Sequence, residues 1–161
     1  MLRYPVTPKA PAMLHLARPL LLAAACSLPL LAFAGPLDER AADAHLKAIA
    51  AGDVDTVMKA YGDEPCMDWI GGPLDGRYRG TEAVRELWKK FAAANDNQPR
   101  PLQRTSIVQS GNPKGVTLTV TAEYGGKTTV RTHQVLVYRD MKLVSEVWQI
   151  DPAAPLTPAA P

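Results

Sequence analysis

Cysteine is scarce in this sequence, which has only 2 among 161 residues, and neither belongs to a CxxC pair. None of the 3 histidines stands four residues from another, the spacing that places two zinc ligands on one face of a helix. No glycine-rich loop joins a predicted strand to a predicted helix in the way that nucleotide binding requires. These absences exclude the usual zinc and nucleotide sites, so we expect neither a metal nor a cofactor.

The N-terminal 34 residues differ in composition from the rest of the chain. Basic residues come first, and the apolar run 19–34 ends in Ala-Phe-Ala before a glycine. This pattern predicts a signal peptide that is cleaved after Ala34. The run is shorter than the roughly 20 residues of a membrane-spanning helix. Met13 is an alternative start, and lipidation at Cys26 is a weaker alternative to cleavage. We expect a secreted protein of the periplasm that has no membrane attachment after cleavage.

Cleavage changes the charge of the protein. It removes Arg3, Lys9 and Arg18, so Lys+Arg falls from 18 to 15 against 16 Asp+Glu, a net charge of 15 − 16 = −1. The mature chain therefore lacks the basic surface that binds nucleic acid phosphates, and we expect no nucleic acid partner. It retains Cys66 as its single cysteine, so it has no internal disulfide and its stability depends on its core.

Three helices are predicted in the first half of the mature chain. Residues 37–52 have apolar side chains at helical spacing and end at Gly52, a suitable C-terminal cap. Asp53 is a suitable N-cap for a short helix over residues 54–61, and Thr81 for a third helix. The third helix has the clearest apolar stripe, which consists of Val84, Leu87, Trp88 and Phe91.

The sequence also predicts a sheet. A short strand over 65–70 precedes a turn rich in glycine, and alternation of apolar and polar residues begins at Leu102. It indicates four long strands, the last three over 116–124, 127–138 and 142–150. Helices followed by hairpins favour an α+β domain, residues 35–151, whose strongly bent sheet wraps around the helices and leaves a cavity open at one end. The tail 152–161 is rich in Pro and Ala, which predicts disorder.

Several stretches together resemble one known family. AIAAGDVDTVMKAYGDEP, GPLDGRYRGTEAVRELWKKF and VLVYRDMKLVSEVWQID are similar to the nuclear transport factor 2-like superfamily, in its SnoaL-like and ketosteroid isomerase-like branch. The resemblance spans residues 38–151. It implies a cone-shaped, cystatin-like α+β fold, with a curved antiparallel sheet wrapped around three N-terminal helices, often dimeric through the sheet. Members include isomerases, dehydratases and cyclases, but also binding and assembly modules, so the fold does not decide the function.

The resemblance suggests positions for a catalytic set. In the isomerase branch, a tyrosine on the first helix and an acid on a central strand hold an enolate oxygen, while an aspartate on the first short strand moves the proton. The tyrosine position corresponds to His45. The acid position falls on or beside Gln134, which cannot supply a protonated carboxyl group, so steroid-type isomerisation is in doubt. The aspartate position falls on Trp69, or on Asp68 if one residue is deleted.

The candidate acid–base residues are therefore Asp68, His45 and His133. Each has a plain structural alternative: an acid that faces solvent or caps a turn, or a histidine on the surface. Neighbours on a strand face opposite sides, so one of His133 and Gln134, and one of Asp68 and Trp69, lines the pocket. The predicted pocket-lining residues are Tyr61, Trp69, Trp88, Gln134 and Trp148.

Three functions are compatible with these patterns. The first is binding of a small, mostly apolar or amphipathic molecule in the cone, with no catalytic set established. The second is an isomerase, dehydratase or cyclase that uses a His-Asp acid–base pair without a cofactor. The third is a structural module that forms a homodimer through the sheet. We favour the first, because the family's acid set is incomplete while the residues expected to form the cavity are present.

Overall fold

The structure is a computed structural model that describes residues 36–151. The predicted signal peptide, its cleavage after Ala34 and the Pro/Ala tail lie outside these residues and stay predictions. In chain order the elements are α1 (Pro36–Ala51), α2 (Val54–Ala60), β1 (Tyr61–Ile70), β2 (Gly76–Arg79), α3 (Thr81–Ala93), β3 (Leu102–Asn112), β4 (Gly115–Tyr124), β5 (Val130–Arg139) and β6 (Lys142–Ile150).

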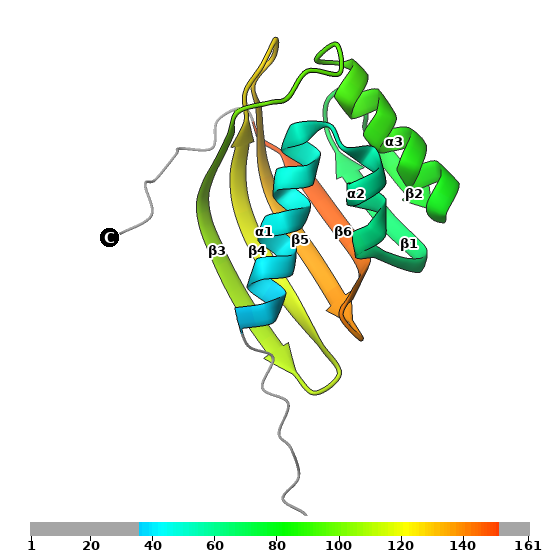
Figure 1. Cartoon of the computed structure of the whole chain (residues 1–161), viewed down its shortest axis with the longest axis vertical. Helices are drawn as coiled ribbons and strands as arrows, with labels where there is room; N and C mark the ends of the chain where they lie inside the picture. The colour runs from blue at the N-terminus through cyan, green and yellow to red at the C-terminus, as the bar shows by residue number, and fades with distance from the viewer. Residues whose placement is uncertain (1–35, 152–161) are drawn as a thin grey trace, which may run out of the picture. The chain divides into compact units, whose positions relative to one another are not determined.

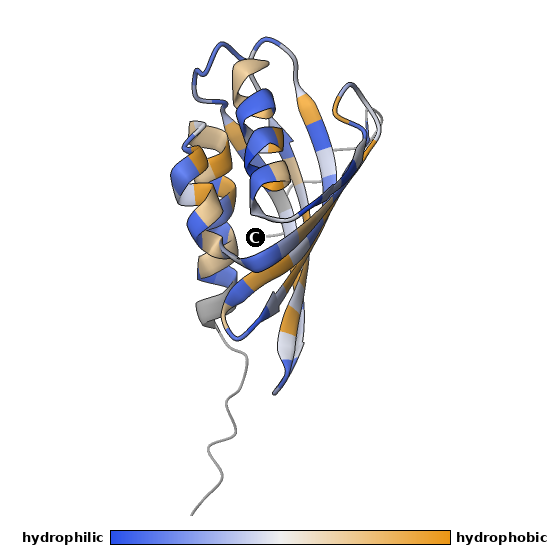
Figure 2. Cartoon of the chain, turned by 90° about the vertical axis from the view of Figure 1, so that its right-hand side faces the viewer, coloured by the Kyte–Doolittle hydropathy of each residue, from blue (hydrophilic) through white to orange (hydrophobic). Residues whose placement is uncertain are grey.

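The predicted α+β class is confirmed. The six strands form one curved, open sheet in the order β2-β1-β6-β5-β4-β3. The helices lie along one face of this sheet, with α1 against β3 and β4 and with α3 against β1 and β2 (Figures 1 and 2). Within residues 36–151, no helix has the length and apolar character needed to cross a membrane.

The sheet is mixed rather than wholly antiparallel. Strand β1 pairs with β6 in parallel, whereas each of the other pairings is antiparallel. The expectation of an antiparallel sheet is wrong for this pair. Parallel neighbours need a long crossover connection, and here the whole segment from β2 to β5 lies between the two strands. The pairing places the end of β1 beside the middle and end of the last strand.

The joint between the first two helices is as predicted. Gly52 ends α1 with a positive φ of 72°, which glycine adopts without strain. The side chain of Asp53 accepts a hydrogen bond from the backbone N–H of Thr56 at 3.0 Å and so caps α2. The predicted end of α2 is wrong by one residue, because Tyr61 has the extended ψ of 152° and begins β1. The strand is therefore longer than the predicted 65–70.

The third helix has the predicted stripe but another cap. Val84, Leu87, Trp88 and Phe91 are buried, as the spacing predicts. Thr81 is not the N-cap; Gly80 is, with φ 81°, and no side chain caps the helix. The Thr81 hydroxyl instead donates to the carbonyl of Asp63 at 3.2 Å, which ties the start of α3 to β1.

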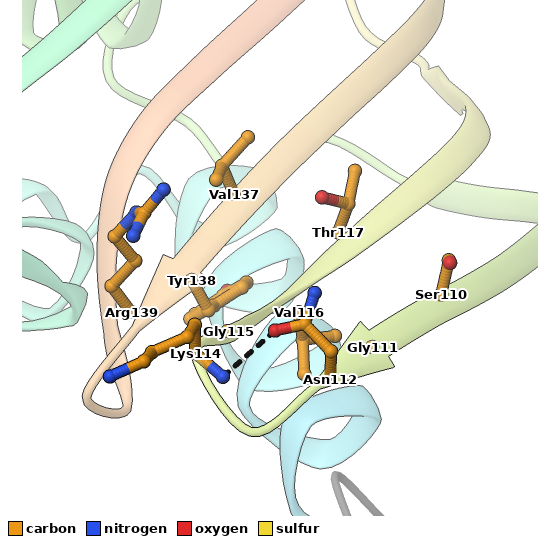
Figure 3. A pocket seen from close by; sticks show the side chains of 10 residues that line it. All are labelled: Ser110, Gly111, Asn112, Lys114, Gly115, Val116, Thr117, Val137, Tyr138 and Arg139. Carbon is orange, nitrogen blue, oxygen red and sulfur yellow. Dashed lines mark hydrogen bonds between the residues drawn. The ribbon is translucent and has the colours of Figure 1, made fainter.

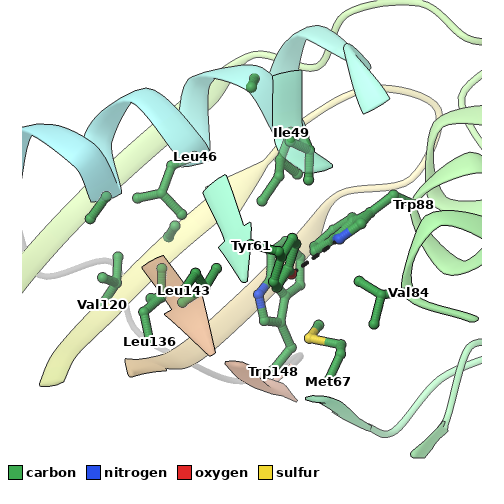
Figure 4. Packing of buried hydrophobic residues seen from close by; sticks show 14 of the residues in the cluster. Leu46, Ile49, Tyr61, Met67, Val84, Trp88, Val120, Leu136, Leu143 and Trp148 are labelled. Atoms are coloured by element: carbon green, nitrogen blue, oxygen red, sulfur yellow. Dashed lines mark hydrogen bonds between the residues drawn. The ribbon is translucent and has the colours of Figure 1, made fainter. Parts of the chain in front are cut away.

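The core lies between the helices and the inner face of the sheet. Figure 2 shows apolar and polar residues alternating along the strands, as expected when one face of a sheet is buried. Figure 4 shows side chains from α1, β1, α3 and the last three strands meeting in this layer. The outer face of the sheet has the half-buried Val135, Val137 and Val147. The expected homodimer through this face stays a prediction.

Candidate functional site

Aromatic side chains fill the interior between α3 and the sheet. Trp148 on β6 is central: it stacks on Trp69 with ring centroids 4.9 Å apart and on Tyr124 at 5.1 Å. Trp88 and Phe91 on α3 meet Trp148 edge to face, at 5.1 and 5.7 Å. Such offset and edge-to-face pairs add about 0.5–1.5 kcal/mol each beyond the apolar area that they bury.

A buried carboxylate lies next to this aromatic cluster. Glu146 on β6 has an exposed fraction of 0%. Its Oε2 accepts hydrogen bonds from the Tyr61 hydroxyl at 2.5 Å and from Nε2 of His45 at 3.1 Å, and its Oε1 accepts from Nε1 of Trp148 at 2.5 Å. We call Glu146, His45, Tyr61, Trp88 and Trp148 the Glu146 network.

The hydrogen bonds of the Glu146 network share one direction. Nε1 of Trp88 donates to the Tyr61 oxygen at 3.2 Å, and Tyr61 donates onward to Glu146 (Figure 4 shows the first bond). An indole nitrogen can only donate a hydrogen bond, so the hydrogens of these bonds point from Trp88 to Tyr61 and from Tyr61 to the carboxylate of Glu146. Nδ1 of His45, the other ring nitrogen, is buried and has no hydrogen-bond partner among the described residues.

Burial perturbs the tyrosines of this interior. Burial, together with the negative charge of Glu146, raises the pKa of Tyr61 well above the usual 10.0. Burial also raises the pKa of Tyr124, on the other side of Trp148. Both hydroxyls therefore keep their protons at a pH where exposed tyrosines lose them.

The raised tyrosine pKa values predict a loss of stability at alkaline pH. Above about pH 10 the unfolded chain has lost both protons while the folded chain retains them, so the free energy of unfolding falls by ~1.4 kcal/mol per pH unit for each tyrosine. This stabilisation is complete below pH 10 and is lost as the pH rises towards the folded-state pKa. Urea unfolding between about pH 9 and pH 11 measures the slope. Tyr61→Phe should reduce the slope by about half, and an unchanged slope would contradict the assignment.

An apolar pocket with a volume of about 270 Å³ is lined by Trp69, which also stacks on Trp148 of the Glu146 network. Trp69 and Phe91 line its inner end. The turn 71–74 after β1, the end of α3, Arg100, the start of β5 and Ile150 complete its wall. Nε1 of Trp69 donates to the carbonyl of Gly71 at 3.0 Å, which fixes the indole against the turn.

Arg100 is the charged residue of this wall. Its exposed fraction is 5%, and its Nη1 donates to the carbonyls of Gly125 and Thr128, at 2.9 Å each. The guanidinium carbon lies 4.7 Å from the centre of the Phe91 ring, a cation–π distance. Burial lowers the pKa of Arg100, and its Nε has no hydrogen-bond partner.

A second, more polar pocket of about 180 Å³ lies at the other end of β4 and β5, beside the turn between β3 and β4 (Figure 3). There the side-chain oxygen of Asn112 accepts from the backbone N–H of Lys114 at 2.8 Å. Ser110, Thr117 and Arg139 also line it. Exposed residues, among them Ser110, Asn112 and Arg139, make up much of its lining, and we assign it no ligand.

The structure does not bring the three candidate acid–base residues together. Asp68 lies on the outer face of β1 and forms an ion pair with Arg77 of β2. His133 is exposed on the outer face of β5, where it hydrogen-bonds Thr121 and contacts Asp151. Only His45 reaches the interior, with an exposed fraction of 2%. A His-Asp pair built from these residues therefore has no geometric support.

The predicted pocket-lining residues lie inside, but most belong to the core. Trp69, not Asp68, faces the interior, and it lines the apolar pocket. Tyr61, Trp88 and Trp148 belong to the Glu146 network. Gln134 is buried as well: its Nε2 donates to the Tyr124 hydroxyl at 3.1 Å and to Oγ1 of Thr132 at 2.8 Å.

Glu146 and Arg100 are buried residues with charged side chains that the sequence did not predict as site residues. Alternation along β6 contained a signal for Glu146, because a residue two positions from an inward tryptophan faces the same side. The interior acid therefore lies on β6 at Glu146, one strand away from the position predicted at Gln134 on β5. Among the described residues, no group of three or more His, Cys, Asp or Glu is placed to hold a metal ion.

Comparisons with known proteins agree with this architecture. The model of the SnoaL-like domain family matches residues 42–146. No curated protein matches the sequence significantly.

Among solved structures, an NTF2-like protein of unknown function from Burkholderia xenovorans is 21% identical, with a TM-score of 0.55 over 74% of this chain and 88% of the other. A SnoaL-like protein of unknown function from Burkholderia thailandensis is 17% identical, with a TM-score of 0.57 over 72% and 95%. A protein of unknown function with a cystatin-like fold from Nostoc punctiforme is 16% identical, with a TM-score of 0.57 over 74% and 92%. At these identities the solved structures support the fold alone.

Proposed function

The chain belongs to the SnoaL-like domain family, and from this premise we propose that it binds a small, mostly apolar molecule in the pocket beside Trp69 and Phe91. The family fold supports ligand binding or isomerase-type chemistry. The observation that carries the proposal is the pocket itself. It is apolar, it reaches the aromatic interior, and it has a single charged side chain in its wall.

The size and lining of the pocket fit a small ligand. Sites for drug-sized molecules have volumes of about 300–1,000 Å³ and are lined mainly by apolar and aromatic side chains with few polar groups. A pocket of about 270 Å³ lies just below this range, which suits one or two rings or a short chain. Its rim is held in place, because the carboxylate of Asp75 accepts from the backbone N–H of Gly71 at 2.6 Å.

The enclosure of the Glu146 network favours binding over acid–base catalysis. Glu146 and His45 are buried, and no residue of the network is among those that line the pocket. A general base has to lie within hydrogen-bond reach of its substrate, directly or through one water. Neither Glu146 nor His45 lines the pocket. We therefore assign the network a structural role, in which it fixes Trp88 and Trp148, the two tryptophans that pack against Trp69.

Binding can be tested with N-phenylnaphthylamine, a neutral apolar dye whose fluorescence rises in apolar sites. We expect saturable binding by the protein. Thr129 is exposed at the pocket rim, so Thr129→Trp should cover the entrance and weaken binding at least about tenfold, which is ~1.4 kcal/mol. The matched control is Thr119→Trp, because Thr119 is equally exposed but lies on the outer face of β4.

The control separates pocket binding from adsorption to the surface. Thr119→Trp should bind the dye as the unmodified protein does. If no binding is seen, or if the two variants change it equally, the pocket is not the binding site and the proposal is wrong. Native mass spectrometry of the protein from its producing cells then identifies any molecule that copurifies with it.

A further inference from the structure

We infer that the ligand of this pocket is amphipathic and carries a carboxylate, which Arg100 binds while the rest of the molecule occupies the apolar wall. This inference rests on the proposed binding function and adds the chemical class of the ligand. The charges in the pocket wall are not balanced. Among the described residues, the pocket is lined by one cation and by no carboxylate.

The charge of Arg100 is not compensated within the described protein. Ion pairs hold Arg77, Arg85, Arg104 and Arg131, all more exposed than Arg100, but none is recorded for Arg100. Its recorded side-chain hydrogen bonds go to two neutral carbonyls. A guanidinium stays charged in proteins, and a buried charge is costly unless it is paired. An anionic ligand would supply the missing partner.

Arg100 has N–H donors that its two recorded side-chain hydrogen bonds do not use. A guanidinium has five N–H donors, and Nη1 uses its two for the carbonyls of Gly125 and Thr128. Nε has no partner. Elsewhere in this protein, the edge of a guanidinium formed by Nε and Nη2 binds a carboxylate. These two atoms of Arg77 donate to the two oxygens of Asp68, at 2.5 and 3.1 Å. Such bidentate pairs are typical of arginine and carboxylate.

The surroundings hold the guanidinium at the pocket wall. The backbone N–H of Arg100 donates to the carbonyl of Ala50 at 2.6 Å, which anchors the loop to the end of α1. The side chain lies over the Phe91 ring. Nε is buried in this structure, so a carboxylate reaches it only if the neighbouring wall moves. The lining also includes Trp69, Leu74 and Ile150, whose apolar side chains suit the remainder of the ligand.

Arg100 has a purely structural alternative, in which its bonds to Gly125 and Thr128 only hold the connection between β4 and β5. The two roles differ in what they predict for binding. A structural role predicts that removing the guanidinium weakens all ligands alike. Carboxylate recognition predicts a selective loss for the acid.

The test compares phenylbutyrate with phenylbutanol, which share the ring and chain and differ in the head group. Each displaces N-phenylnaphthylamine from the protein, and the ratio of the two dissociation constants is measured. We expect the unmodified protein to prefer the acid about 10- to 100-fold, as charge-assisted hydrogen bonds allow. Arg100→Met should abolish this preference while phenylbutanol still binds. Arg100→Lys keeps the positive charge but loses the paired N–H donors of the guanidinium, so it should retain part of the preference for the acid.

The outcomes separate this inference from the proposed function. If the dye binds in the pocket but the unmodified protein shows no preference for the acid, the carboxylate assignment is overturned and apolar binding stands. The same holds if Arg100→Met weakens both compounds equally. If neither compound nor the dye binds, both proposals fail. The preference of the unmodified protein decides the matter even if Arg100→Met does not fold.

Discussion

Replacing Glu146 with leucine is expected to lower the free energy of unfolding by about 3–5 kcal/mol, the cost of removing one partner from a buried charged network. The carboxylate accepts hydrogen bonds from His45, Tyr61 and Trp148, and all three donors lose their acceptor together. Leucine has a similar volume, so the loss reflects the unpaired polar groups rather than a cavity. Urea unfolding followed by tryptophan fluorescence measures the change.

The matched control is Glu123→Leu, which removes another strand carboxylate. Glu123 lies on the outer face of β4, where it pairs with Arg131 at 2.8 Å near the solvent. Ion pairs of this kind contribute about 0–1 kcal/mol, so this variant should remain close to the unmodified protein. Equal losses for the two leucine variants would show that the buried network contributes no special stability. The structural role assigned to Glu146 would then be wrong.

The helices and the turns were predictable because their signals are local. Gly52 and Asp53 end one helix and cap the next through contacts within a few residues. The stripe from Val84 to Phe91 needs only the helical period to show which side is buried. Where the local signals failed, at Thr81 and Tyr61, a contact with another element took precedence.

The register of β1 was not predictable because it depends on distant residues. The local sequence allows either Asp68 or Trp69 to face inward. The parallel pairing aligns Trp69 with Trp148 and Asp68 with Val147, 79 residues further along the chain in each case (148 − 69 and 147 − 68). The stacked indoles fill the interior, while Asp68 finds Arg77 on the outer face. In the resemblance to the isomerase branch, an alignment without a gap places Trp69 at the position of the family's aspartate.

The site residues were the hardest to predict. An arginine between two prolines in a loop, as in Pro99-Arg100-Pro101, has no local feature that predicts burial. Alternation suggests that Glu146 faces inward, yet a carboxylate is stable there only because donors from α1, the start of β1 and β6 itself converge on it. That convergence is a property of the tertiary structure.

Replacing Trp148 with alanine is expected to cost about 3–5 kcal/mol, the usual range for removing a buried tryptophan. The indole stacks between Trp69 and Tyr124, so its loss leaves a cavity in the aromatic interior and an unpaired Oε1 on Glu146. Trp148→Phe keeps most of the ring volume and removes only the donor, so its cost should be smaller, about 1–3 kcal/mol. The difference in the free energy of unfolding between the two variants reflects the packing of the indole, whereas the cost of Trp148→Phe reflects mainly the lost hydrogen bond.

The same pair of variants tests whether the interior supports the pocket. Trp69 lines the pocket and also stacks on Trp148. With alanine at position 148, Trp69 loses its support and can move into the new cavity, so N-phenylnaphthylamine should bind more weakly or with altered fluorescence. With phenylalanine, the support remains and dye binding should change little. If alanine destabilises the fold but leaves dye binding unchanged, the Glu146 network stabilises the protein without positioning the pocket, and its proposed role in binding is wrong.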